Sequence, residues 1–136
     1  MTSKTKKILI VEDDKLLQQV YFDKLVKDGF IILQAFTGRQ GLTLATNYQP
    51  DLVVLDVMLP GGLNGFDVLT QLRANVSFKH TPIIMLTDLK GERKTAESIG
   101  ATDYIIKDEN KIDETISKIK TYLNVNLVGE IKKILK

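Results

Sequence analysis

Short apolar runs alternate with longer amphipathic stretches along most of the chain. The runs occupy residues 8–11, 30–35, 52–55, 82–86 and 104–106. Several of them are apolar at consecutive positions, which is typical of parallel strands that helices cover on both faces. The pattern therefore predicts five short strands in a parallel sheet.

The stretches between these runs carry apolar residues at helical spacing. Three sets stand out, namely Leu17, Tyr21 and Leu25, then Leu42, Ala45 and Tyr48, then Val68, Leu69, Leu72 and Val76. A fifth helix is expected over residues 111–123, burying Ile112, Ile116, Ile119 and Leu123. Each predicted helix would place one apolar face on the sheet.

Local signals indicate where some of these helices begin and end. Gly29 and Gly100 are expected to stop two of them, because glycine tolerates the left-handed conformation that often follows a helix. Thr37 and Gln40 match the spacing of a capping box at the start of another. These signals support the helices independently of the apolar pattern.

A strand followed by a helix, repeated five times with right-handed crossovers, predicts an α/β fold with a doubly wound sheet. In such a sheet the first and third strands are neighbours. The loops at the carboxyl ends of the strands form the ligand crevice. Function is therefore expected at that edge.

Composition narrows the class of protein. The 136 residues fit one domain, and 43% hydrophobic with 26% charged residues is typical of a packed globular core. The absence of cysteine excludes disulfides and thiolate metal sites. A net charge of +2 with interspersed signs gives no indication of nucleic-acid binding. No segment has the length of a membrane span or of a signal-peptide core, so we expect a cytoplasmic protein without membrane insertion.

The last residues of the chain, 124–136, lie beyond the predicted domain at residues 1–123. Apolar residues recur there at nearly helical intervals, namely Leu127, Val128, Ile131, Ile134 and Leu135. Three interpretations stay open: a helix packed on the domain, an oligomerisation segment, or the start of a linker. We expect a C-terminal helical extension or linker, and a monomer or weak homodimer.

Acidic residues gather where the first and third apolar runs end. Glu12, Asp13 and Asp14 follow the first run, and Asp56 follows the third. Two like charges about 4 Å apart repel by roughly 4 kcal/mol at the dielectric constant usual near protein surfaces, so a cation is expected among them. Oxygen ligands of this number and charge suit Mg2+, with Asp13 and Asp56 as direct ligands. Taken alone, such a cluster is more often a helix cap, and Asp14 fits that role.

Two further groups at the same edge complement these carboxylates. Thr87 ends the fourth run with a hydroxyl that can donate to an anion, and Lys107 ends the fifth with a positive charge. Each alone is more often a loop or surface residue. Together with a metal and several carboxylates, they fit a site that holds a phosphoryl group on an aspartate.

Four segments of the chain resemble the response regulator receiver family. They read Ile-Leu-Ile-Val-Glu-Asp-Asp at 8–14, Asp-Leu-Val-Val-Leu-Asp-Val-Met-Leu-Pro at 51–60, Pro-Ile-Ile-Met-Leu-Thr at 82–87 and Asp-Tyr-Ile-Ile-Lys at 103–107. The resemblance spans about residues 5–123 and makes residues 1–123 a receiver domain. It implies a flavodoxin-like sheet in strand order 2-1-3-4-5. It also implies a phosphorelay protein that is not a conventional enzyme and catalyses only its own phosphorylation and dephosphorylation.

The resemblance implies roles for the acidic residues. Asp56 matches the phosphoacceptor of the family. Glu12 and Asp13 match the acidic pair that binds Mg2+, and Met58 matches the residue whose backbone carbonyl completes the metal shell. The implied cofactor is therefore Mg2+.

The resemblance also implies a switch and its partners. Thr87 and Lys107 match the switch hydroxyl and the lysine that pairs with the phosphate, and Tyr104 matches an aromatic residue that turns inward when the threonine moves toward the phosphate. The phosphoryl donor would be a sensor histidine kinase or a histidine phosphotransfer protein. The downstream target would be another protein, which the sequence does not identify.

Three departures from the family pattern keep a rival open. The loop after Pro60 is one residue longer than usual, Asp108 stands where proline is usual and removes the expected cis bond, and Asp88 follows Thr87 where a small residue is usual. We expect Asp108 to loosen Lys107. The carboxylate of Asp88, about 7 Å from a phosphoryl group on Asp56, would disfavour that group by about 2 kcal/mol before screening. The rival is a receiver-like scaffold that no longer switches and binds partners constitutively.

Two rivals from other classes fit less well. A phosphatase of the haloacid dehalogenase type would carry an Asp-x-Asp pair at the first strand, whereas the candidate nucleophile here ends the third. A flavin carrier would need a first turn that accepts a phosphate, and an acidic turn repels one.

Overall fold

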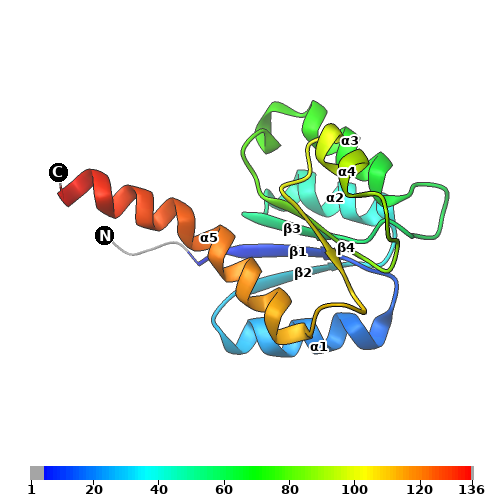
Figure 1. The fold of residues 1–136 in the computed structure, drawn as a ribbon, viewed down its shortest axis with the longest axis horizontal. Coiled ribbons are helices and arrows are strands. Elements are labelled where there is room, and N and C mark those ends of the chain that lie inside the picture. Colours follow the sequence, from blue (N-terminus) through cyan, green and yellow to red (C-terminus); the bar gives the residue numbers. More distant parts are fainter. Residues whose placement is uncertain (1–4, 136) are drawn as a thin grey trace.

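Five parallel strands form the centre of the molecule (Figure 1). The structure, a computed structural model, describes the backbone of residues 5–135 and the side chains of residues 5–123. The strands are β1 (Lys7–Val11), β2 (Ile31–Ala35), β3 (Leu52–Leu55), β4 (Ile83–Thr87) and β5 (Asp103–Ile106). Their order in the sheet is β2-β1-β3-β4-β5. This confirms the predicted doubly wound, flavodoxin-like arrangement.

Helices cover both faces of the sheet. They are α1 (Lys15–Lys27), α2 (Gly38–Tyr48), α3 (Gly65–Ala74), α4 (Arg93–Ile99) and α5 (Ile112–Leu135), with a short 3-10 helix η1 (Val76–Phe78) after α3. Helices α1 and α5 lie on one face, and α2, α3 and α4 lie on the other (Figure 1). The strands are therefore enclosed between two helical layers.

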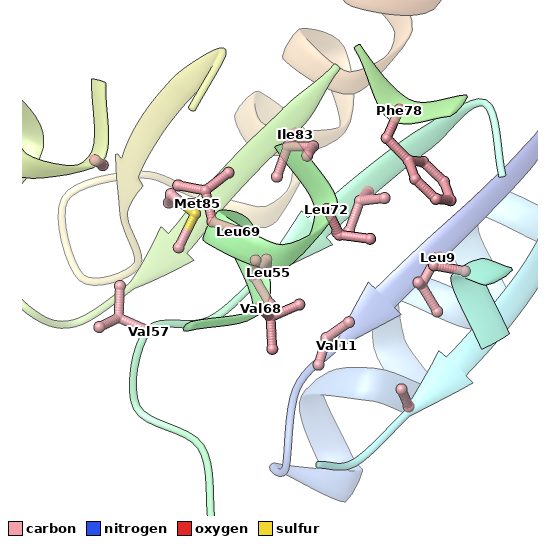
Figure 2. Packing of buried hydrophobic residues seen from close by; sticks show 14 of the residues in the cluster. Leu9, Val11, Leu55, Val57, Val68, Leu69, Leu72, Phe78, Ile83 and Met85 are labelled. Atoms are coloured by element: carbon pink, nitrogen blue, oxygen red, sulfur yellow. The ribbon is translucent and has the colours of Figure 1, made fainter. Parts of the chain in front are cut away.

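Each face of the sheet has its own hydrophobic cluster. In β1, Leu9 and Val11 pack toward α2 and α3, whereas Ile8 and Ile10 pack toward α1 and α5. Figure 2 shows the first of these clusters, in which the side chains of α3 lie against the strands. Because successive side chains of a strand point to opposite faces, both faces require apolar residues. This explains why the strands are apolar at consecutive positions.

The helix starts follow their capping residues. Thr37 accepts a hydrogen bond from the amide of Gln40 at 3.1 Å, as predicted, but the Gln40 side chain accepts from the amide of Phe36 instead of Thr37. A complete capping box occurs at α3, where Asn64 and Asp67 each accept from the other's amide at 2.9 Å. The sequence analysis did not identify this second box.

The helix ends are partly as predicted. Gly29 and Gly100 follow α1 and α4 with φ angles of 94° and 124°. The prediction that Val76 continues the third helix is wrong, because α3 ends at Ala74 and Val76 begins η1 with 83% of its surface exposed. The capping side chain of Asn75 accepts from the amide of Ser77 and starts this separate turn.

The backbone of α5 continues without interruption from Ile112 to Leu135. Its C-terminal half extends past the end of the sheet (Figure 1). The three interpretations of residues 124–136 concern side chains outside the described part of the chain, so they stay predictions. Within residues 5–135, no helix combines the length and the apolar character needed to cross a membrane.

A close backbone contact fixes the start of α3 beside the end of β3. The amide of Gly65 donates to the carbonyl of Val57 at 2.7 Å. A Cβ atom on Gly65 would lie 2.1 Å from the carbonyl oxygen of Asp56 and 2.7 Å from the Cα of Val57. Glycine at this position therefore lets the helix approach the strand end where a candidate site residue lies.

We predict that Gly65→Ala lowers the free energy of unfolding by about 2–3 kcal/mol, because two backbone segments must separate to admit the methyl group. Urea unfolding followed by circular dichroism measures this change. Gln71→Ala, an exposed substitution in the same helix, is the control and should change it by less than about 0.5 kcal/mol. A neutral or stabilising Gly65→Ala would contradict the close contact.

Candidate functional site

Backbone hydrogen bonds align the ends of the five strands. The amide of Asp56 donates to the carbonyl of Val11 at 3.0 Å, and the amide of Lys107 donates to the carbonyl of Thr87 at 2.9 Å. The amide of Glu12 donates to the carbonyl of Ala35 at 2.9 Å. Parallel pairing therefore continues one residue beyond β1, β3 and β5. It brings the residues that follow these strands to one edge of the sheet.

Lys107 lies between two carboxylates from neighbouring strands. Its Nζ donates to Asp56 Oδ2 at 2.8 Å and also to Glu12 Oε1. The side chains of Glu12 and Asp56 are 5% and 7% exposed, and that of Lys107 is 19% exposed. The ammonium group therefore offsets two nearly buried negative charges.

Burial and charge shift the titration of this group of residues. Burial and, to a lesser extent, the negative charge of Asp56 raise the pKa of Glu12 to about 7, against the lowering effect of the hydrogen bond from Lys107. Burial alone would lower the pKa of Lys107, but its hydrogen bonds to Asp56 and Glu12 raise it to about 12. Lys107 therefore stays charged at neutral pH.

Three carboxylates come together at this edge. Glu12, Asp13 and Asp56 each offer an oxygen atom, and these atoms all lie within 4.8 Å of one another. Lys107 supplies one positive charge to them, so with Glu12 ionised the cluster keeps an excess of negative charge. The donor set consists of hard oxygen ligands and matches the preference of Mg2+. The residues therefore fit a divalent cation.

The two carboxylate oxygens of Asp56 accept hydrogen bonds from two different donors. The amide of Met58 donates to Oδ1 at 3.1 Å, while Lys107 binds Oδ2. The side chain of Met58 is 62% exposed and lies outside the core. The role implied for its backbone carbonyl, as a metal ligand, stays a prediction.

Thr87 and Tyr104 are joined through one loop residue. The amide of Leu89 donates to Thr87 Oγ1 at 3.2 Å, and the carbonyl of Leu89 accepts from the Tyr104 hydroxyl at 2.5 Å. Thr87 is fully buried and Tyr104 is 2% exposed, so the tyrosine side chain is turned inward. Burial raises the pKa of Tyr104 above its usual value. The two predicted switch residues are thus linked through Leu89 by two hydrogen bonds.

The three departures from the family pattern, at Asp108, in the loop after Pro60 and at Asp88, can each be located in the structure. Asp108 forms an ion pair with Lys90 at 3.4 Å, whereas Lys107 binds Glu12 and Asp56. No peptide bond of the described residues is cis, as expected without the proline, and Lys107 nevertheless contacts both carboxylates. The expectation that Asp108 loosens Lys107 stays a prediction. The longer loop after Pro60 is accommodated by two glycines at 61 and 62 with φ angles of 87° and 90°. Asp88 is exposed.

Two observations refine the acidic segment after β1. Asp14 caps α1, because its Oδ1 accepts from the amides of Leu16 and Leu17 at 3.0 and 3.1 Å, as the sequence indicated. Gln18, which was not among the predicted site residues, is 1% exposed and donates a hydrogen bond to the backbone at this strand end. A polar residue one helical turn before Tyr21, on the apolar side of the helix, was the available signal.

The comparisons with known proteins agree with this geometry. Residues 8–120 match the model of the response regulator receiver domain. The chain is 31% identical over 121 residues to the polar-differentiation response regulator DivK of Brucella ovis, covering 88% of this chain and 97% of DivK. It is 39% identical over 121 residues to the uncharacterized transcriptional regulatory protein YkoG of Bacillus subtilis, again over 88% of this chain. It spans only about half, 51%, of the length of YkoG.

A solved structure with a metal ion is also similar. It is the receiver domain of the sensor histidine kinase PA1611 from Pseudomonas aeruginosa, crystallised with a magnesium ion coordinated in its active-site cleft. The match has a TM-score of 0.77 and 28% sequence identity, and it covers 89% of this chain and 99% of that one.

We predict that Lys107→Met lowers the free energy of unfolding by about 2 kcal/mol in metal-free protein at pH 8, because two nearly buried carboxylates lose their partner. The loss is smaller than for a fully buried ion pair, since Glu12 can take up a proton. Urea unfolding in the presence of a chelator measures it.

Lys90→Met is the matched control, because Lys90 also pairs with two carboxylates, those of Asp108 and Glu109, but on the exposed surface. It should change stability little. An equal decrease in the free energy of unfolding in both variants would show that the buried ion pair of Lys107 stabilises the fold no more than the exposed pair of Lys90.

Proposed function

We propose, from the premise that this chain belongs to the response regulator receiver family, that it accepts a phosphoryl group on Asp56 in a Mg2+-dependent reaction. Receiver domains are phosphoacceptor switch domains of two-component signalling. The observation that carries the proposal is the cluster of Glu12, Asp13 and Asp56 facing Lys107. A purely structural ion pair would balance its charges. Here the three carboxylates carry more negative charge than Lys107 offsets, which suits a phosphoacceptor that binds a cation.

Asp13 and Asp56 would hold the metal ion directly, with Glu12 beside them and the carbonyl of Met58 as a further ligand. When bound, Mg2+ supplies positive charge to the oxygens of the phosphoryl group. The magnesium ion in the related receiver domain of PA1611 supports this assignment. The excess of negative charge in the present site, with Glu12 ionised, suits a divalent cation.

Asp56 would act as the nucleophile. One carboxylate oxygen forms a bond to phosphorus while the bond between phosphorus and the donor's histidine nitrogen breaks, and that nitrogen keeps the electron pair. Lys107 already contacts the carboxylate and stays protonated, so it can pair with the oxygens of the phosphoryl group. Thr87 lies at the end of the neighbouring strand and would donate its hydroxyl to the same group.

The hydrogen-bonded chain from Thr87 through Leu89 to Tyr104 connects the site to the loop that follows β4. Movement of the threonine toward a phosphoryl group would break its bond to the amide of Leu89. That change would alter the loop that Tyr104 binds. We therefore propose that phosphorylation switches a partner-binding face near Tyr104.

The partners follow from this chemistry. The donor would be a sensor histidine kinase or a histidine phosphotransfer protein, and the target would be a protein. The main alternative is a receiver-like scaffold that binds partners without switching. The exposed Asp88 directly after Thr87 favours it, because a second negative charge opposes a phosphoryl group.

We expect incubation with acetyl phosphate and Mg2+ to add the mass of one phosphoryl group to the wild-type protein, measured by intact mass spectrometry. Asp56→Asn should show no addition, because an amide is a poor nucleophile. Asp23→Asn, an exposed change on α1, is the control and should behave like wild type. Addition to the Asp56→Asn protein would place the acceptor elsewhere.

Beryllofluoride, which mimics the phosphoryl group, separates the switch from the scaffold. In the presence of Mg2+, we expect changes in the amide resonances of Asp56, Thr87, Leu89 and Tyr104 in nuclear magnetic resonance spectra. The reason is that the bond between Thr87 and Leu89 must rearrange to admit the ligand. Changes restricted to Asp56 and its immediate neighbours would favour the scaffold.

A further inference from the structure

A buried glutamine on α1 binds the backbone where the acidic segment begins. The Nε2 of Gln18 lies 2.9 Å from the carbonyl oxygen of Ile10, 3.1 Å from that of Glu12 and 2.8 Å from that of Ala35. These carbonyls belong to the carboxyl ends of β1 and β2 and to the residue that follows β1. Gln18 is 1% exposed, so water does not compete for these bonds.

The position is costly for a polar side chain. The Oε1 of Gln18 is buried and has no hydrogen-bond partner among the described residues, and a buried unsatisfied acceptor costs about 1–3 kcal/mol. Methionine has nearly the same shape and would avoid this cost. It would, however, remove the side-chain donor from the buried carbonyls of Ile10 and Glu12, and it would leave the carbonyl of Ala35 with the amide of Glu12. The side chain is therefore required for its N–H groups.

Hydrogen bonds hold the peptide groups on both sides of Glu12, and Gln18 supplies the one on the side of Asp13. The amide of Glu12 is bound to the carbonyl of Ala35, and its carbonyl is bound to Gln18. The second peptide group includes the amide of Asp13. Asp13 is exposed, and no hydrogen bond from a described residue holds its carboxylate, so the backbone at this residue determines from where, and in which general direction, the side chain leaves the chain.

We propose that Gln18 is a positioning residue that directs the carboxylates of Glu12 and Asp13 toward Asp56 and so sets the affinity of the metal site. The inference rests on the proposed Mg2+ site. Cap residue Asp14 holds the other end of the same short segment through the amides of Leu16 and Leu17. The acidic segment is thus anchored at both ends, and Gln18 is the anchor on the strand side.

The test compares Gln18→Met with Gln19→Met in the full chain. Gln19 is the exposed neighbour on the same helix, and its side-chain amide donates to the carboxylate of Asp23. Isothermal titration calorimetry gives the dissociation constant for Mg2+. We expect Gln18→Met to weaken binding about tenfold, as the loss of outer-shell partners of metal ligands commonly does. Gln19→Met should stay within about twofold of wild type.

A second measurement separates positioning from simple destabilisation. In folded, metal-free protein, Gln18→Met should speed hydrogen exchange at the amides of Glu12 and Asp13 but not at core amides of β3. Gln18→Arg supplies N–H donors without an orphan acceptor and should restore Mg2+ binding to within about threefold of wild type. If Gln18→Met does not fold, Gln18→Asn replaces it, because its shorter side chain cannot reach all three carbonyls.

The outcomes are distinct. If wild type and Gln19→Met fail to bind Mg2+, the proposed metal site is wrong. If both bind and a folded Gln18→Met or Gln18→Asn binds within twofold of them, the positioning role is wrong. A Gln18→Arg protein as weak as Gln18→Met would also overturn it, because the donors would then be irrelevant.

Discussion

The contact of the Lys107 ammonium group with the carboxylates of Glu12 and Asp56 is the interaction on which the site depends. Two nearly buried carboxylates on neighbouring strands would otherwise repel each other strongly, in a domain whose total stability is only on the order of 10 kcal/mol. The lysine offsets part of this charge and leaves the rest, together with Asp13, to attract a cation. The same contact therefore permits the burial of the acidic pair and prepares it to bind a metal.

The sheet makes this contact possible because all its strands are parallel. Their carboxyl ends lie at one edge, and backbone hydrogen bonds beyond β1, β3 and β5 keep the following residues in line. The two hydrophobic clusters hold the strands from both faces, so the edge is rigid while the loops carry the chemistry. The close approach of Gly65 to the carbonyl of Asp56 shows how little room the packing leaves around the phosphoacceptor candidate.

Around this edge, several hydrogen bonds connect the site to the rest of the molecule. Leu89 bonds both Thr87 and Tyr104, so a change at the strand end can reach a buried aromatic residue through one loop. Lys90, the next residue, pairs with Asp108 and thereby joins the loops that follow β4 and β5. Such discrete contacts can exist in two arrangements, as a switch requires.

The sequence by itself determined the elements and the residues at their ends. Consecutive apolar positions and capping residues are local signals, so the five strands, the cap at Asp14 and the placement of Asp56 after β3 could be predicted. The predicted strand order also placed the acidic residues and Lys107 at one edge, but only the tertiary structure decided which of these groups pair directly. Lys107 lies 95 residues from Glu12, and the pairing of Asp108 with Lys90 and the contacts of Gln18 depend on strand register and loop paths. Periodicity encodes which face is buried, but it contains no information on such long-range partners.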